Sequence, residues 1–263
     1  MSLFPNTPHP ILFAHRGASL AAPENTLEAF ECGVRLGADF LELDARLTAD
    51  NQVVVLHDGS LIRTTNGRAK VAKLTYAEIR QFDAGYRFNR RAGYPFRDKG
   101  VYIPLLAEVL RAFPKIGFNI ELKGWQPGLE RAVLKVLEEV GPERVLLAAF
   151  SHKMMQAIEA TNPGCPLGMS MTQVRHFIHA SLTKKSVEHF AGRALQIPLR
   201  YRGVPVATPR LVRFAKNNGL DVHLWTLNKP RSIKRWLSLD VDGIMTDDPG
   251  KMYGIFRDFR LDR

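Results

Sequence analysis

The sequence lacks several features that would place it in a specialised class of protein. Only two of its 263 residues are cysteines, Cys32 and Cys165, too few for a disulfide framework or a structural zinc site. No apolar run is long enough to span a bilayer, and the first ten residues hold three prolines and no apolar segment of a signal peptide. No internal repeat, coiled-coil heptad or low-complexity tract is present. These absences predict a cytoplasmic protein that folds around its own hydrophobic core with reduced thiols.

Acidic residues are also few relative to basic ones. The chain has 26 Asp and Glu against 37 Lys and Arg, a formal net charge of +11. Ten basic and four acidic residues lie between residues 58 and 103, and nine basic and one acidic residue between 175 and 216. This charge predicts attraction to anionic partners, with nucleic acid, a membrane surface and phosphorylated metabolites as candidates.

Short apolar runs alternate with segments of helical spacing along most of the chain. The expected strands are residues 11–14, 40–44, 118–122, 145–149, 166–170, 194–197, 222–226 and 243–245. The expected helices include residues 25–36, with Asn25 as N-cap, 129–140, 153–160, 209–217 and 230–237. Alternation of this kind implies parallel strands joined by helical crossovers, and eight such units close a barrel of typically about 250 residues. The sequence therefore predicts one (β/α)8 TIM barrel domain over residues 1–263.

Two irregularities follow the second expected strand. A run at residues 53–56 comes too soon for a helical crossover, so we expect an antiparallel hairpin with its turn near residues 49–51. This hairpin would bring His57 back beside Asp44. From residue 58 to 103 the barrel pattern stops, although seven Phe and Tyr residues are present. A structureless loop of this length is unusual in a compact domain, so we predict a small inserted subdomain over the C-terminal mouth of the barrel.

Charged side chains alternate with leucine or isoleucine in two of the expected strands. The period of two places Glu42 and Asp44 on one face of their strand, and Glu121 on the inward face of the next. Charges inside a barrel are costly unless they are paired or bind a cation, and oxygen ligands suit Mg²⁺, Ca²⁺ or Mn²⁺ better than zinc. The spacing leaves two interpretations, a metal site or simple ion pairs. The cations available for pairing are Arg16, Arg46 and Lys123.

Two of the eight histidines, His15 and His57, directly follow expected strands. The C-terminal ends of barrel strands form the active-site face, so these positions favour catalysis. One imidazole can accept a proton from an attacking oxygen while the other donates a proton to a leaving alkoxide. Arg16 could bind a phosphate oxygen, which suits a phosphodiester. Trp225 also ends a strand, where it is either a core aromatic residue or an apolar wall of the pocket.

These residues lie in segments that resemble the motifs of the glycerophosphodiester phosphodiesterase family. The matching segments are AHRG at 14–17, APENT at 22–26, ELD at 42–44, HD at 57–58, RTTNG at 63–67, IELK at 120–123, WTLN at 225–228 and VDGIMTD at 241–247. They occur in order over nearly the whole chain.

The resemblance implies a TIM barrel with an insert after the second strand, and a divalent cation, Mg²⁺ or Ca²⁺ with Mn²⁺ as a third candidate. It implies hydrolysis of a glycerophosphodiester to sn-glycerol 3-phosphate and an alcohol such as choline or ethanolamine. The residues to which it assigns roles are Glu42, Asp44 and Glu121 for the cation, His15 and His57 for acid–base catalysis, and Arg16 and Lys123 for the phosphate. We expect His15 to accept a proton and His57 to protonate the leaving alcohol.

Two other functions compete with this one. A lysophospholipase D would use the same chemistry on a lysophospholipid. A non-enzymatic basic barrel that binds nucleic acid or anionic membrane would explain the charge, but it leaves the inward carboxylates and strand-end histidines without a role, and no nucleic-acid-binding motif is present. We therefore expect a small water-soluble glycerophosphodiester as the partner, no nucleic acid, no stable membrane insertion and at most weak contact with an anionic surface.

Overall fold

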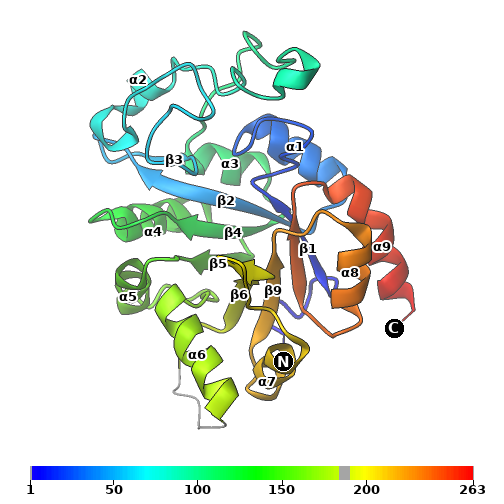
Figure 1. The fold of residues 1–263 in the computed structure, drawn as a ribbon. Coiled ribbons are helices and arrows are strands. Elements are labelled where there is room, and N and C mark those ends of the chain that lie inside the picture. Colours follow the sequence, from blue (N-terminus) through cyan, green and yellow to red (C-terminus); the bar gives the residue numbers. More distant parts are fainter. Residues whose placement is uncertain (1, 184–189, 263) are drawn as a thin grey trace.

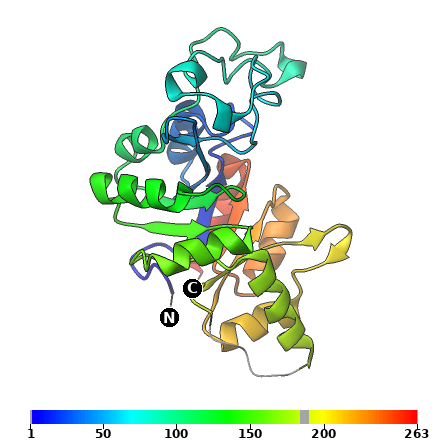
Figure 2. The same cartoon turned by 90° about the vertical axis from the view of Figure 1, so that its left-hand side faces the viewer.

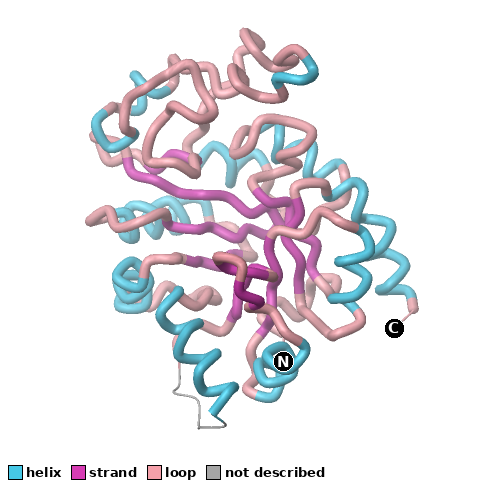
Figure 3. Tube along the Cα trace, in the orientation of Figure 1, coloured by secondary structure: helices cyan, strands magenta, loops and turns pink. Residues whose placement is uncertain are grey.

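A computed structural model describes residues 2–183 and 190–262. At its centre is a curled sheet of parallel strands, with helices around the outside (Figures 1 and 3). The strands, in their spatial order, are β5 (Val145–Ala148), β4 (Gly117–Leu122), β2 (Phe40–Leu47), β1 (Ile11–His15), β10 (Gly243–Thr246), β9 (Asp221–Trp225) and β6 (Ala194–Pro198). Each adjacent pair is parallel. The predicted TIM barrel is confirmed.

Residues 166–170 occupy the gap between the two ends of this sheet. They were predicted as a regular strand, but they pair only through single parallel bridges, Leu147 with Leu167 and Gly168 with Ala194. The Gly168 N–H donates to the carbonyl of Leu147 at 2.8 Å, and the Met169 N–H donates to that of Ala194 at 3.0 Å. Pro166 has no N–H to donate, which shortens the ladder. The segment nevertheless connects β5 to β6 and closes the barrel.

The helices follow the strands and cover the outside of the barrel (Figure 1). Their bounds are α1 (Leu27–Arg35), α3 (Leu106–Ala112), α4 (Leu129–Val140), α5 (His152–Ala160), α6 (Met171–Thr183), α7 (Pro209–Asn217), α8 (Pro230–Leu237) and α9 (Pro249–Leu261). Their buried aliphatic residues pack against the outward side chains of the strands in two large clusters. No helix in the described residues is both long and apolar enough to cross a membrane.

Helix α1 begins later than predicted, because its N-cap is Thr26 and not Asn25. The Thr26 hydroxyl accepts a hydrogen bond from the Ala29 N–H at 3.3 Å. Asn25 instead adopts a left-handed backbone conformation with φ 59°, and its side-chain amide donates to Asp44 Oδ2 at 2.8 Å. Its side chain is therefore used to hold a carboxylate of β2.

Alternate residues of each strand face the barrel interior and form layers of changing polarity. Phe13 of β1 and Phe40 of β2 are neighbours in the register and pack with ring centroids 5.3 Å apart in the lower, apolar layer. Two residues further along, His15 and Glu42 are neighbours at the upper end. The sheet thus positions charged side chains at the C-terminal face on an apolar floor.

The predicted hairpin is present. β3 (Val53–Val55) pairs antiparallel with the end of β2, and Ala45 lies opposite Val55. The Leu56 N–H donates to the carbonyl of Asp44 at 2.9 Å, so the return strand delivers His57 to the neighbourhood of Asp44.

Residues 58–103 lie beyond this hairpin, next to α1 and α3 (Figure 1, cyan). They contain the short helices η1 (Val71–Lys73), α2 (Tyr76–Ile79) and η2 (Arg90–Ala92). Buried aliphatic residues of this segment share a small cluster with β3. Several aromatic rings lie against arginines of the same segment, such as Tyr102, whose centroid is 3.1 Å from Arg80 Cζ. The division of the chain into a barrel and an inserted subdomain stays a prediction.

A second hairpin follows β6 and had no counterpart in the sequence prediction. It consists of β7 (Arg200–Tyr201) and β8 (Val204–Pro205), which pair antiparallel. Figure 2 shows this hairpin, in yellow, projecting outward from the body of the barrel.

Candidate active site

A cavity of about 390 Å³ opens among the C-terminal ends of the strands. Its lining includes all of the predicted site residues except Asp44: His15, Arg16, Glu42, His57, Glu121, Lys123 and Trp225. Asp44 is completely buried next to this lining. The barrel therefore brings together residues that are up to about two hundred positions apart in the sequence.

The three carboxylates meet at one side of the cavity. Glu42 and Asp44 come from β2, and Glu121 of β4 is the register neighbour of Asp44. One oxygen from each residue lies within 4.8 Å of the others. Such a set of oxygen ligands from two adjacent strands could hold a divalent cation.

Cations of the chain also reach this cluster. Lys123 Nζ lies 3.1 Å from Asp44 Oδ1 and 2.9 Å from Glu121 Oε2, and Arg16 Nε lies 3.2 Å from Asp44 Oδ2. The third candidate, Arg46, donates to the backbone carbonyl of His57 at 2.8 and 2.6 Å, and so anchors the end of the hairpin. The ion pairs foreseen as an alternative to a metal site are thus present for Arg16 and Lys123.

Arg16 and Lys123 neither neutralise the three carboxylates nor provide hydrogen bonds to all of their buried oxygens. Burial, together with the charge of Asp44, raises the pKa of Glu42 to about 7. Burial also opposes the ionisation of Asp44, but the charges of Lys123 and Arg16 outweigh it and lower the pKa of Asp44. Although Lys123 Nζ is near, the buried Asp44 Oδ1 receives no hydrogen bond of acceptable geometry. An excess of carboxylate charge and a buried oxygen without a donor fit a bound divalent cation.

A carboxylate lies within hydrogen-bond distance of the Nδ1 atom of each of the two histidines. His15 Nδ1 lies 2.7 Å from Asp247 Oδ1, and His57 Nδ1 lies 2.7 Å from Asp58 Oδ1. A carboxylate in this position accepts the Nδ1–H, fixes the tautomer and leaves Nε2 for the substrate. The roles of Asp247 and Asp58 were missed from the sequence, although both lie in the matching segments.

The two imidazoles have different electrostatic surroundings. Burial tends to lower the pKa of His15, but the charges of Glu42 and Asp247 outweigh it and raise this pKa. Burial is the largest cause of the lowered pKa of His57; the charge of Asp44 opposes it, and those of Lys123 and Arg16 add to it. Taken from the side chains alone, these shifts favour a protonated His15 and a neutral His57, which is the reverse of the starting states that the expected roles require.

The backbone makes a tight turn at Arg16 and Gly17, directly after β1, and this turn requires glycine at position 17. Arg16 has φ 56°, and its backbone N–H donates to Glu42 Oε2 at 2.9 Å. Gly17 has φ 81°, and a Cβ atom there would lie 2.5 Å from the carbonyl carbon of Ala29 in α1. Only glycine allows this approach, which holds the catalytic end of β1 against the first helix.

A chain of ion pairs links the two histidine-bearing segments. Arg63 donates to Asp58 at 2.5 Å and to both oxygens of Glu24 at 2.6 and 2.7 Å, while Glu24 accepts from Arg16 at 2.9 Å. Arg63 is thus engaged outside the cavity. Residues 58–103 are all described, and none of them lines the cavity. The placement of the insert over the mouth of the barrel therefore stays a prediction.

The opposite side of the cavity is apolar. Ala148 is the last residue of β5, Ala149 and Phe150 follow it, and Met169 and Trp225 complete this wall. Trp225 also packs on the apolar cluster inside the barrel, so it serves both as pocket wall and as part of the core. Phe150 is 48 % exposed at the rim, with its ring centroid 6.5 Å from that of Tyr201 in β7.

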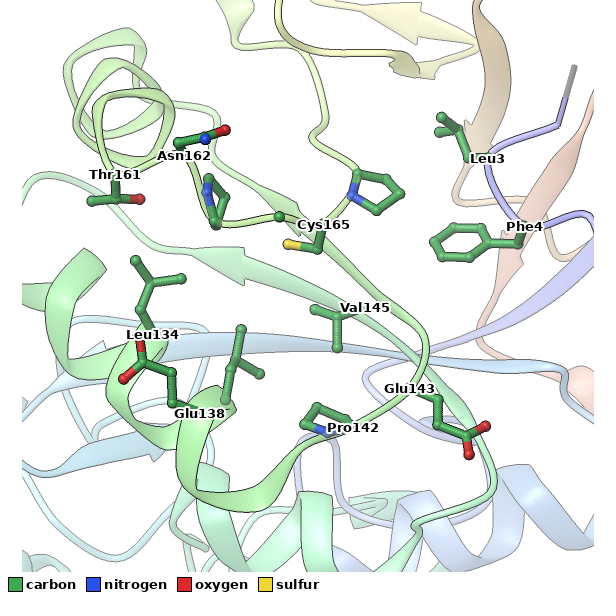
Figure 4. A pocket seen from close by; sticks show the side chains of 14 residues that line it. Leu3, Phe4, Leu134, Glu138, Pro142, Glu143, Val145, Thr161, Asn162 and Cys165 are labelled. Atoms are coloured by element: carbon green, nitrogen blue, oxygen red, sulfur yellow. The ribbon is translucent and has the colours of Figure 1, made fainter.

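A larger cavity, of about 470 Å³, lies away from these residues (Figure 4). It is formed by the N-terminal segment, α4 and the loop before residue 166, and it contains Cys165, Glu138 and Glu143 but no histidine. Burial raises the pKa of the Cys165 thiol to about 11, which makes this thiol a poor nucleophile. The two histidines, Glu42 and Glu121 line the smaller cavity and Asp44 is buried next to it, so this cavity is our candidate active site.

The chain is similar to known proteins over nearly all of its length. The sequence profile of the "Glycerophosphoryl diester phosphodiesterase family" matches residues 15–251, a range that begins at His15 and includes Asp247. The chain belongs to this family. A glycerophosphodiester phosphodiesterase of Caldanaerobacter subterraneus is 32 % identical over 253 residues, covering 94 % of this chain and 98 % of that protein.

Two further relatives bear on the substrate. A phosphodiesterase of Oleispira antarctica, solved in complex with the product sn-glycerol-3-phosphate, has a TM-score of 0.75 and 25 % identity, and each chain covers 100 % of the other. Lysophospholipase D of Homo sapiens is 26 % identical over 94 % of this chain and 86 % of its own length. The relatives of this chain thus include one solved with sn-glycerol-3-phosphate and one named a lysophospholipase D.

Proposed function

We propose that this protein hydrolyses a water-soluble glycerophosphodiester to sn-glycerol 3-phosphate and an alcohol. The observation that carries this proposal is the convergence of two carboxylate-partnered imidazoles, a cluster of three carboxylates and two cations on one cavity. The product bound to the Oleispira relative supports the same substrate class.

The carboxylate cluster is the proposed site of a divalent cation. Glu42, Asp44 and Glu121 would hold Mg²⁺ or Ca²⁺, with Mn²⁺ as a third candidate, and a bound cation would neutralise phosphate charge and polarise the phosphorus–oxygen bonds. Lys123 and Arg16, which lie against the same carboxylates, are placed to bind phosphate oxygens.

The imidazoles supply the proton transfers. We assign His15 as the acceptor of the proton from the attacking oxygen, which belongs to water or to the neighbouring glycerol hydroxyl. His57 in its protonated form, which the charge of Asp44 and the hydrogen bond to Asp58 favour against burial, then donates to the leaving alcohol. Asp247 and Asp58 hold each Nδ1–H and so aim each Nε2 at the cavity. Glu42 is a principal cause of the raised pKa of His15, so a cation on Glu42 would reduce that effect and help His15 to act as a base.

Lysophospholipid hydrolysis is the second candidate. The exposed Phe150 and the apolar wall favour it, because an acyl chain could leave the cavity on that side. We favour the soluble substrate since the matching family is that of glycerophosphoryl diester phosphodiesterases and the Oleispira relative was solved with sn-glycerol-3-phosphate. A single barrel domain over residues 1–263 with an insert at 58–103, and a cytoplasmic location, complete the proposal.

The test is a substrate panel with controlled metal. Glycerophosphocholine, glycerophosphoethanolamine, glycerophosphoinositol and lysophosphatidylcholine would each be assayed with Mg²⁺, Mn²⁺ or Ca²⁺ after removal of bound metal. We expect the highest kcat/KM on one of the three soluble diesters. A clear preference for lysophosphatidylcholine would select the lysophospholipase D function instead.

A further inference from the structure

A basic surface lies next to the active-site mouth, outside the cavity itself. It comprises Arg200, Arg202, Lys229, Arg231 and Arg235, which we call the basic rim. Four of these five cations, all except Arg202, line a surface cavity of about 540 Å³ together with Pro205. The rim therefore joins the β7–β8 hairpin to the start of α8.

Among the residues that the structure describes, no carboxylate is ion-paired with the basic rim. Residues 190–220 contain six Lys and Arg and no acidic residue, and residues 222–239 contain four and none. In the part of the chain that the structure describes, none of the five rim cations forms an ion pair. In contrast, Arg16 and Arg63 at the active site are paired with acids. All five rim side chains are exposed, so their charge is available to an anionic partner.

The β7–β8 hairpin contributes exposed apolar side chains beside the basic rim. Val204 is 64 % exposed and Tyr201 is 38 % exposed, at the end of a two-stranded element that projects from the barrel (Figure 2). Apolar side chains that are held out in water cost free energy unless a partner covers them. A tyrosine suits a membrane interface, because its ring is apolar and its hydroxyl stays hydrated.

We propose that the β7–β8 hairpin and the basic rim dock on an anionic phospholipid bilayer. The side chains of Tyr201 and Val204 enter the interface, and the rim cations bind lipid phosphates. A single-stranded nucleic acid fits this surface less well, because it calls for a row of stacking aromatic rings, and the hairpin offers one tyrosine beside a valine. The inference rests on this surface and not on the catalytic reaction proposed above.

Docking in this way has a geometric consequence. Tyr201 is in contact with Phe150, and Phe150 lines the active-site cavity. The mouth of the cavity would thus face the bilayer surface, while a soluble diester could still enter from the side of the charged residues. Vesicle binding and the hydrolysis of a soluble substrate can therefore be measured separately.

The experiment is co-sedimentation of the full chain with phosphatidylcholine vesicles, with and without phosphatidylglycerol, at low and high salt. We expect binding to the anionic vesicles that high salt weakens. Arg202→Gln with Arg231→Gln should weaken binding about fivefold per cation, because each basic residue near an anionic surface contributes on the order of 1 kcal/mol. Tyr201→Ser with Val204→Ser should weaken binding about tenfold through lost apolar contact.

The matched control is Arg90→Gln with Arg91→Gln, which removes the same charge from η2 in the insert. This pair should leave vesicle binding within about twofold of the wild type. All three double variants should retain kcat/KM on glycerophosphocholine, which shows that each is folded. Equal losses in the control and rim variants would overturn the proposal in favour of a general charge effect. Tighter binding of an oligonucleotide than of anionic vesicles, lost in the rim variant, would overturn it in favour of nucleic acid.

Discussion

His223 in β9 makes the stability of the barrel dependent on pH. Its side chain is fully buried, and burial, assisted by the charges of His9 and Lys216, lowers its pKa to about 3. Its Nδ1 accepts from Gln196 Nε2 at 3.3 Å, and its Nε2 has no hydrogen-bond partner. The ring lies against Phe13, with centroids 4.9 Å apart, so a positive charge here would have little solvation.

The magnitude follows from the difference between folded and unfolded states. The unfolded chain protonates His223 at a pKa of about 6.5, whereas the folded chain resists protonation down to about 3. There is no penalty above the unfolded pKa, and stability is lost as the pH falls from about 6.5 toward about 3 at about 1.4 kcal/mol per pH unit. Between about pH 7 and about pH 4, His223 alone therefore lowers the free energy of unfolding by about 3 kcal/mol.

The perturbation is His223→Leu, which replaces the imidazole with an apolar side chain that cannot ionise. Gln196 keeps a partner in this variant, because its Nε2 also donates to Asn119 Oδ1 at 2.8 Å. Urea unfolding of wild type and variant, followed by circular dichroism at a series of pH values, gives the difference in unfolding free energy. As the pH falls from about 7 to about 4, we expect the unfolding free energy of the variant to rise by about 3 kcal/mol relative to that of the wild type. His176→Leu, which removes an exposed imidazole from α6, serves as control and should give parallel curves. Parallel curves for His223→Leu would refute the reasoning.

Four further predictions concern the active site and the thiol. Chelation with EDTA should abolish activity and a divalent cation should restore it, and full turnover in excess EDTA would contradict the metal site. Glu42→Gln should weaken metal affinity by more than about tenfold in a calorimetric titration without unfolding the protein. His57→Ala should cost on the order of 10²–10⁴ in kcat on natural diesters but far less on a p-nitrophenyl ester, whose leaving group needs no proton; equal losses on both would assign His57 another role. Asp247→Asn should reduce kcat with little change in KM and shift the acidic limb of the profile of activity against pH, because the raised pKa of His15 depends partly on this carboxylate. An unchanged pH profile would show that Asp247 has only a structural role. Alkylation of Cys165 by iodoacetamide in the folded protein at about pH 8 should be about a hundredfold slower than in urea, since its pKa is raised to about 11, and equal rates would show an ionised thiol.

Local pattern was enough to predict the strands of the barrel and the first hairpin. The alternation in β2 identified the inward carboxylates, and the short spacing between β2 and β3 placed His57 near Asp44. Both inferences use geometry within one or two elements, where chain length and side-chain period restrict the outcome strongly.

The contacts that depend on closure of the barrel could not be predicted in the same way. The partnership of His15 with Asp247 arises because β10 pairs with β1, and nothing near either residue indicates the other. The N-cap of α1 was misplaced since Asn25 is engaged by Asp44 across the fold. The β7–β8 hairpin escaped prediction because each of its strands has only two residues, too few for a period to show.

The pairing of the first strand with the last also controls when activity can appear during synthesis. His15 and Asp247 are 232 residues apart in the chain. At about 5–20 residues per second, a ribosome needs on the order of 10–50 s to make the second after the first. A nascent or prematurely terminated chain that ends before β10 thus carries His15 without the carboxylate that orients it. The cell would meet this hydrolase in competent form only once the ribosome has made β10 and Asp247.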